Sequence, residues 1–136
     1  MNRILVDTSA YSAFMYGHGG AVAAIQEADQ IYVNPVIIGE LLTGFLRGSR
    51  ATKNEQELQE FLGSPRVRDL DLDRATSRRY AVIVNALWKA GTPIPTNDIW
   101  IAATAMQHGL ELVTLDAHYL KVAQIVVHHL GREDSE

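Results

Sequence analysis

Short apolar runs alternate with longer helical patterns along this chain, and the alternation limits the folds it can adopt. The runs are bounded by polar or glycine residues, which is typical of buried strands. We expect strands at 3–6, 31–33, 67–70, 112–114 and 125–127. Strands separated by helices favour an α/β domain with a mainly parallel central sheet of about five strands flanked by helices.

The helical segments are marked by capping residues and by glycines that end them. Asn34-Pro35 is a typical helix start, because asparagine caps well and proline suits the first turn. The residues Gly17–Gly20 are expected to form a loop between the first two helices. Helices are predicted at 8–16, 21–28, 35–47, 51–62, 73–89 and 97–108, with a short helical piece at 117–122.

Length and composition fit one domain and exclude several chemistries. A chain of 136 residues with 47% hydrophobic content can bury one core, so we expect a domain over 1–130 and a polar tail over 131–136. The absence of cysteine excludes disulfides, thiolate zinc sites and cysteine nucleophiles. No apolar run is long enough for a signal peptide or a membrane span, so a cytoplasmic protein without membrane contact is expected.

Two acidic residues follow predicted strands. Asp7 comes directly after the first strand, and Asp116 lies two residues past the strand that ends at Thr114. In an open parallel sheet the functional crevice lies outside the carboxyl ends of the strands. If these two strands are neighbours, both carboxylates project into one crevice. Alone, Asp7 could equally be a helix cap and Asp116 a turn residue.

Glu40 is the only charged residue between Asp29 and Arg47. No Lys or Arg stands three or four residues away, so a salt bridge within the helix is excluded. Burying a carboxylate without a partner costs on the order of several kcal/mol. A cation beside Glu40 would offset this cost. A hydrogen-bond network and an opening to solvent are the alternatives. Asp98 opens a mostly apolar helix, where its charge also favours the helix dipole.

Clustered carboxylates suit metal-dependent chemistry. Neighbouring negative charges repel each other, and a hard divalent cation relieves that repulsion. Oxygen ligands without cysteine favour Mg²⁺ or Mn²⁺ over zinc. The net charge of −4 is unfavourable for broad electrostatic binding of nucleic acid. The objection is removed if the acids are gathered where such ions neutralise them.

Four segments of the chain carry the acids in a fixed order: Ile4–Ser9, Gly39–Leu42, Asn97–Ala103 and Leu112–Asp116. Together they resemble the signature segments of PIN-domain nucleases, specifically VapC-type toxins of bacterial toxin–antitoxin pairs. The resemblance covers essentially the whole chain, and it implies a single PIN-like domain.

The resemblance also implies a Mg²⁺- or Mn²⁺-dependent endoribonuclease acting as a toxin on RNA. It carries Asp7, Glu40, Asp98 and Asp116 over as the metal-binding and catalytic set, supported by the hydroxyl of Thr114. A cognate antitoxin, bound near the early helices, and a homodimer are implied as well. His118 stands where many relatives have another acid, and a surface or capping role is expected for it.

Other functions remain as alternatives. A PIN-like domain that only binds RNA or a protein would be expected to lack one of the acids, and all four are present. A phosphoacceptor domain needs an acidic pair after the first strand, which is absent here. A haloacid-dehalogenase-like phosphatase needs an acid two residues after Asp7, where Ser9 stands.

Overall fold

The central sheet has five strands, and every neighbouring pair is parallel. The computed structural model describes residues 1–132, so residues 133–136 of the predicted tail lie outside the described residues. The strands are β1 (Arg3–Val6), β2 (Gln30–Val33), β3 (Val67–Asp69), β4 (Glu111–Thr114) and β5 (Val127–His129). Their order in the sheet is β3-β2-β1-β4-β5, which confirms the predicted α/β class.

Helices connect successive strands, except for a short 3₁₀ turn between the last two. They are α1 (Thr8–Met15), α2 (Gly19–Glu27), α3 (Pro35–Arg47), α4 (Ala51–Leu62), α5 (Arg74–Ala90), α6 (Thr96–His108) and the 3₁₀ helix η1 (Ala117–Lys121). Most bounds lie within one or two residues of the predicted ones. The helix α2 begins earlier than predicted, because Nδ1 of His18 accepts the backbone N–H of Ala21 at 3.1 Å and caps the glycine-rich start.

The last strand lies two residues later than the sequence indicates. The apolar run ends at Val127, whereas β5 begins there and pairs Val127 with Leu112 and His129 with Thr114. Val126 is largely exposed and contributes its carbonyl to the N–H of Leu112. Because β5 is an edge strand, β4 sets its pairing, and the side chains do not have to be apolar.

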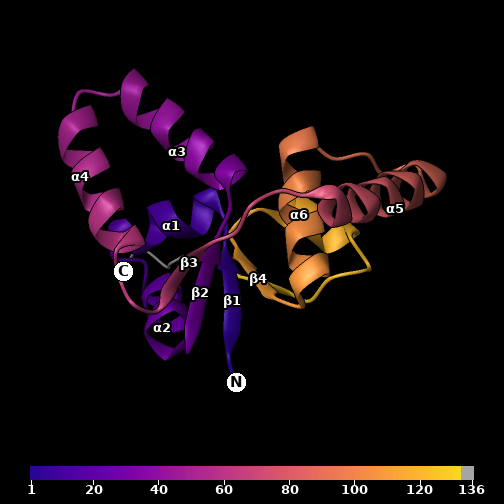
Figure 1. Cartoon of the computed structure of the whole chain (residues 1–136), viewed down its shortest axis with the longest axis horizontal. Helices are drawn as coiled ribbons and strands as arrows, with labels where there is room; N and C mark the ends of the chain where they lie inside the picture. The colour runs from indigo at the N-terminus through magenta and orange to yellow at the C-terminus, as the bar shows by residue number, and fades with distance from the viewer. Residues whose placement is uncertain (133–136) are drawn as a thin grey trace.

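The core is centred on β1. Its residues Ile4, Leu5 and Val6 are at most 1% exposed, because the strand is buried on both faces of the sheet. In Figure 1, α1–α4 gather on the β3 side of the sheet, and α5 and α6 lie beside β4. An edge-to-face contact between Tyr11 and Phe61, with ring centroids 5.1 Å apart, ties α1 to α4.

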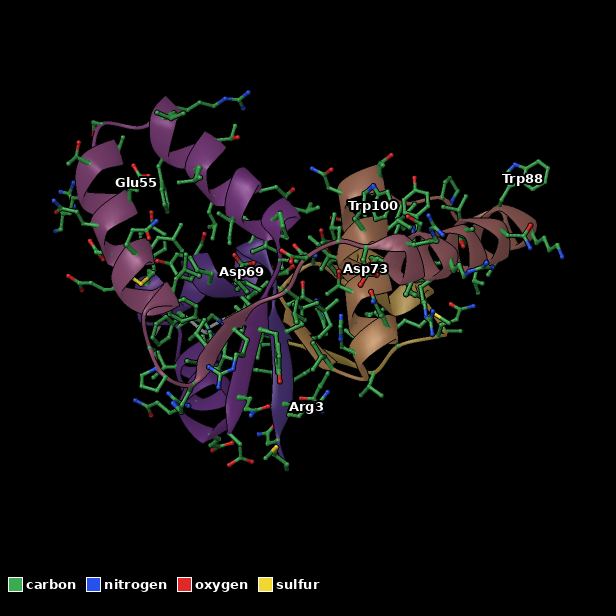
Figure 2. All side chains as sticks on the ribbon, in the orientation of Figure 1. Arg3, Glu55, Asp69, Asp73, Trp88 and Trp100 are labelled. Carbon is green, nitrogen blue, oxygen red and sulfur yellow. The ribbon has the colours of Figure 1, made fainter. Side chains whose placement is uncertain are left out.

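The long helix α5 packs along α6 and steadies it. The rings of Tyr80 and Trp100 stack with centroids 4.2 Å apart, and Gln107 donates to the carboxylate of Asp73 at 2.9 Å. Figure 2 shows Asp73 and Trp100 where the two helices meet, and Trp88 at the far end of α5. Within residues 1–132, the helices are too short or too polar to cross a membrane.

Candidate active site

Asp7 lies at the carboxyl end of β1, beside the carboxyl end of β4. These two strands are parallel neighbours, with Val6 opposite Val113, and the backbone N–H of Asp7 donates to the carbonyl of Val113. The adjacency on which the sequence prediction depended is therefore present. Asp7 is 3% exposed, so its carboxylate is buried at the edge of the sheet.

Three donors satisfy the carboxylate of Asp7. Its Oδ2 accepts the hydroxyl of Thr114 at 2.6 Å, and its Oδ1 accepts the hydroxyl of Ser9 at 2.7 Å and the N–H of Ala10 at 2.8 Å. Burial nevertheless raises the pKa of Asp7 to about 6, with a smaller contribution from the charge of Asp116. A cation beside this carboxylate would offset the cost of burying its charge.

Thr114 and Ser9 connect the end of β4 to the start of α1. The hydroxyl of Thr114 also accepts the N–H of Asp116 at 2.9 Å, so one side chain contacts both acids. The hydroxyl of Ser9 accepts the N–H of Leu115 at 3.0 Å. The sequence indicated a supporting part for Thr114 and none for Ser9, whose only signal was its place two residues after Asp7.

Glu40 is half-buried on α3, and its partners come from other helices. Its Oε1 accepts the hydroxyl of Thr8 at 2.6 Å, and its Oε2 accepts the side-chain amide of Asn97 at 3.4 Å. The start of α3 is set by the fully buried Asn34, which caps the N–H of Ile37 at 2.9 Å. Asn34 thereby positions the helix that carries Glu40 toward α1 and α6.

Asp98 and Asp116 meet at His118. The Nδ1 atom of His118 lies 3.1 Å from Oδ2 of Asp98 and 3.0 Å from Oδ1 of Asp116. One ligand atom from each of the three residues falls within a 4.8 Å cluster. The His118 side chain is 45% exposed, yet its ring bridges two acids, which the surface role expected from sequence did not anticipate. Burial and the charge of Asp116 raise the pKa of Asp98.

Tyr119 is a buried neighbour of this cluster. Its ring is 1% exposed, and its hydroxyl donates to Oδ1 of Asp98 at 3.2 Å. Burial raises the pKa of Tyr119 strongly, and the charges of Asp7, Asp98 and Glu40 raise it further. Of these three carboxylates, the one that the hydroxyl contacts by a hydrogen bond is that of Asp98. Sequence analysis gave Tyr119 no part in the site.

Two clefts open beside Glu40. One, of about 570 Å³, lies between α3 and the start of α6 and includes Glu40, Arg47 and Asn97. The other, of about 580 Å³, lies among α1, α3 and α4 and extends from Glu40 to Arg50 and Lys53. Of the four acids, Glu40 is the one that lines these clefts, so it is accessible from outside along the α3 side.

The donor set fits a divalent cation. It consists of carboxylate oxygens and one imidazole nitrogen, which bind such ions in proteins. The ion pairs of Asp98 and Asp116 found within residues 1–132 are both made with His118. No lysine or arginine among those residues neutralises the two acids by a direct pair, which leaves that place open to a metal ion.

Comparison with known proteins agrees with this class of fold and site. The family model of the PIN domain matches residues 4–125, so the chain belongs to the PIN-domain family. Two relatives place it more narrowly. It is 35% identical over 95 residues to ribonuclease VapC4 of Mycobacterium tuberculosis, covering 70% of this chain and 73% of that protein. It is 32% identical over 126 residues to ribonuclease VapC1 of Rickettsia felis, covering 89% and 90%. Within the family, the chain belongs to the VapC ribonucleases.

A solved structure supports the fold independently. The crystal structure of VapBC-5 from Mycobacterium tuberculosis, a member of the VapBC family of toxin–antitoxin systems, contains a similar chain. The TM-score is 0.73 at 22% identity, and the match covers 96% of this chain and 100% of that one.

Proposed function

We propose that Asp7, Glu40, Asp98 and Asp116 form the active site of a Mg²⁺- or Mn²⁺-dependent endoribonuclease that acts as the toxin of a toxin–antitoxin pair. The observation that carries this proposal is the close approach of Asp98, Asp116 and His118, whose ligand atoms lie within 4.8 Å of one another, beside the buried Asp7 that Thr114 links to Asp116. Membership of the VapC ribonucleases supports the reaction class.

Asp98 and Asp116 would hold the metal ion, with Asp7 on the buried side of the site. A bound divalent cation supplies activation of water and neutralisation of charge on the phosphate. Thr114 keeps Asp7 and Asp116 in place, since its hydroxyl contacts both residues. Tyr119 orients Asp98 through Oδ1.

Glu40 would orient the attacking water and accept its proton at Oε2. Its other oxygen, Oε1, is held by Thr8, so the side chain is positioned before substrate arrives. Asn97 lies on the opposite wall of the cleft and contacts Oε2. A positioned carboxylate within reach of water is what general base catalysis requires.

RNA would run along the cleft between α3 and α6. Arg47 lines this cleft together with Glu40, so a cationic group lies near the proposed catalytic base. Its guanidinium could pair with a backbone phosphate, because phosphate contacts position a strand without reading its sequence. The overall charge of −4 makes such a local cation more important.

The groove among α1, α3 and α4 is our candidate for the antitoxin-binding face. It is lined by Tyr11, Met15, Tyr16 and Phe45, and Tyr16 is 92% exposed. Exposed apolar groups beside a catalytic cleft favour a protein partner. The VapBC-5 structure comes from a toxin–antitoxin system, which supports a partner of this kind. A homodimer remains a prediction.

Cleavage of total cellular RNA by the purified chain tests the proposal. Discrete fragments are expected with Mg²⁺ or Mn²⁺, and none with EDTA. Asp7→Asn should abolish cleavage, while Asp29→Asn is the matched control, because Asp29 is exposed at the opposite end of the sheet. Absence of cleavage by folded protein free of antitoxin would favour a binding domain instead. Cleavage that survives in Asp7→Asn would contradict the assigned site.

A further inference from the structure

His118 is the one nitrogen donor that the described part of the chain adds to the acid cluster. Its Nδ1 lies 3.0 Å from Oδ1 of Asp116 and 3.1 Å from Oδ2 of Asp98. Adjacent ligands of an octahedral ion with bonds of about 2.1 Å are separated by roughly 3 Å, the bond length multiplied by √2. The nitrogen is thus spaced from both oxygens as a neighbouring ligand of one ion would be.

The surrounding hydrogen bonds hold the three groups in this arrangement. The backbone N–H of His118 donates to Oδ1 of Asp116 at 2.9 Å, which fixes the turn between them. The hydroxyl of Tyr119 donates to Oδ1 of Asp98, so its other oxygen faces the imidazole. The His118 side chain is 45% exposed, which gives an ion access from solvent.

The imidazole alters which ion the site should favour. Mg²⁺ prefers oxygen ligands and retains water, whereas imidazole nitrogen suits first-row transition metals. Mn²⁺ accepts both carboxylates and imidazole. An acid cluster containing one nitrogen is therefore better matched to Mn²⁺ than an all-carboxylate cluster would be.

We propose that Nδ1 of His118 is a ligand of the divalent cation bound by Asp98 and Asp116, and that this nitrogen makes the site prefer Mn²⁺ to Mg²⁺. The inference rests on the proposed function, since it concerns the same metal site. It assigns His118 to metal binding, in place of the surface or capping role expected from the sequence.

Pulsed electron paramagnetic resonance of Mn²⁺ bound to the purified protein tests the ligand directly. A ¹⁴N modulation from a coordinated imidazole is expected in the wild type and in His128→Asn. The latter is the matched control, because His128 is a half-exposed histidine on β5 that faces Glu111 and not the cluster. The modulation should vanish in His118→Asp, which replaces the nitrogen by an oxygen donor.

Calorimetric titration with Mn²⁺ and with Mg²⁺ tests the preference. In His118→Asp the ratio of Mn²⁺ affinity to Mg²⁺ affinity should fall several-fold, because an oxygen donor replaces the nitrogen that favours the transition metal. If this variant is not folded by circular dichroism, His118→Asn replaces it, and the wild-type spectrum alone already tests ligation.

The outcomes separate this inference from the proposed function. Mn²⁺ that binds without nitrogen modulation, or an unchanged affinity ratio in a folded His118 variant, would overturn the assignment of His118. The metal site would still stand if Asp98→Asn abolished binding. No binding of either ion to the wild type would contradict the metal-dependent function itself, and the inference with it.

Discussion

The hydroxyl of Thr114 donates a 2.6 Å hydrogen bond to Oδ2 of Asp7, across 107 positions of sequence. Thr114 is fully buried at the end of β4, and Asp7 is nearly so at the end of β1. The bond therefore joins the two strand ends at the candidate site and supplies the buried carboxylate with a donor.

Thr114→Val should impair metal binding and RNA cleavage in addition to lowering the stability of the fold. Valine has nearly the same shape but leaves Asp7 without this donor, a loss of about 1–3 kcal/mol in stability. Both RNA cleavage and metal affinity should fall as well. Thr76→Val is the control, because Thr76 is equally buried and its hydroxyl bonds Asp73 and Gln107, away from the four acids. Denaturant unfolding, metal titration and cleavage should show both variants destabilised and only Thr114→Val impaired. Equal impairment would refute a specific part for Thr114.

Asp7→Asn should stabilise the metal-free protein at neutral pH. The pKa of Asp7 is raised by burial from 3.8 to about 6, so the folded state binds its proton more tightly than the unfolded state. The contribution of this proton to the free energy of unfolding is complete below pH 3.8 and is lost as the pH rises through about 6. Between these two limits the wild type loses about 3 kcal/mol of stability. Asparagine has no such dependence and keeps a capping oxygen for Ala10.

Urea unfolding in EDTA at several pH values measures this effect. The stability gained by Asp7→Asn over the wild type should grow between pH 4 and pH 7 and then level off, and Asp29→Asn should show no such growth. A constant difference across that range would mean that the pKa of Asp7 is not raised.

Tyr119→Phe should lower metal affinity with little loss of stability. The change keeps the buried ring but removes the donor to Oδ1 of Asp98, and loss of such a supporting bond costs about 10–100-fold in affinity. Tyr11→Phe is a matched control, because the hydroxyl of Tyr11 is buried and has no hydrogen-bond partner among the described residues. Titration with Mn²⁺ distinguishes the two. An unchanged affinity in Tyr119→Phe would show that Asp98 is positioned without this bond.

Glu40→Gln should reduce kcat by about 10²–10⁴-fold, the usual contribution of a general base. Stability should change little, because glutamine retains an oxygen to accept the hydroxyl of Thr8. Single-turnover cleavage with saturating metal measures the rate. Glu57→Gln, in the groove lined by α4, serves as control. A rate within a few-fold of the wild type would exclude Glu40 as the base.

Much of the fold could be predicted from local patterns. The apolar runs predicted five strands, and Asn34-Pro35 and Asp73 marked helix starts that the structure confirms. Capping bonds and amphipathic spacing depend on residues a few positions apart, so they can be recognised in one sequence. The exceptions are the start of α2 and the position of β5, which depend on a histidine cap and on pairing with β4.

The candidate site depended more on tertiary structure. The sequence alone indicated the four acids, because they stand at strand ends or on apolar helices, whereas the part of Thr114 followed only from the resemblance to VapC-type toxins. Their roles remain proposals. The bridging position of His118 and the hydrogen bond from Tyr119 to Asp98 could not be predicted, because both join η1 to α6 across about 20 residues.

The sequence by itself thus determined the type and order of the elements and the residues that carry negative charge. Only the tertiary structure decided that β1 and β4 are neighbours, that α3 brings Glu40 to Thr8, and that α6 brings Asp98 to His118 and Tyr119. The physical reason is the range of the forces involved. Helix caps and hydrophobic periodicity are local, whereas strand order follows from how the crossover helices bury their apolar faces on the whole sheet.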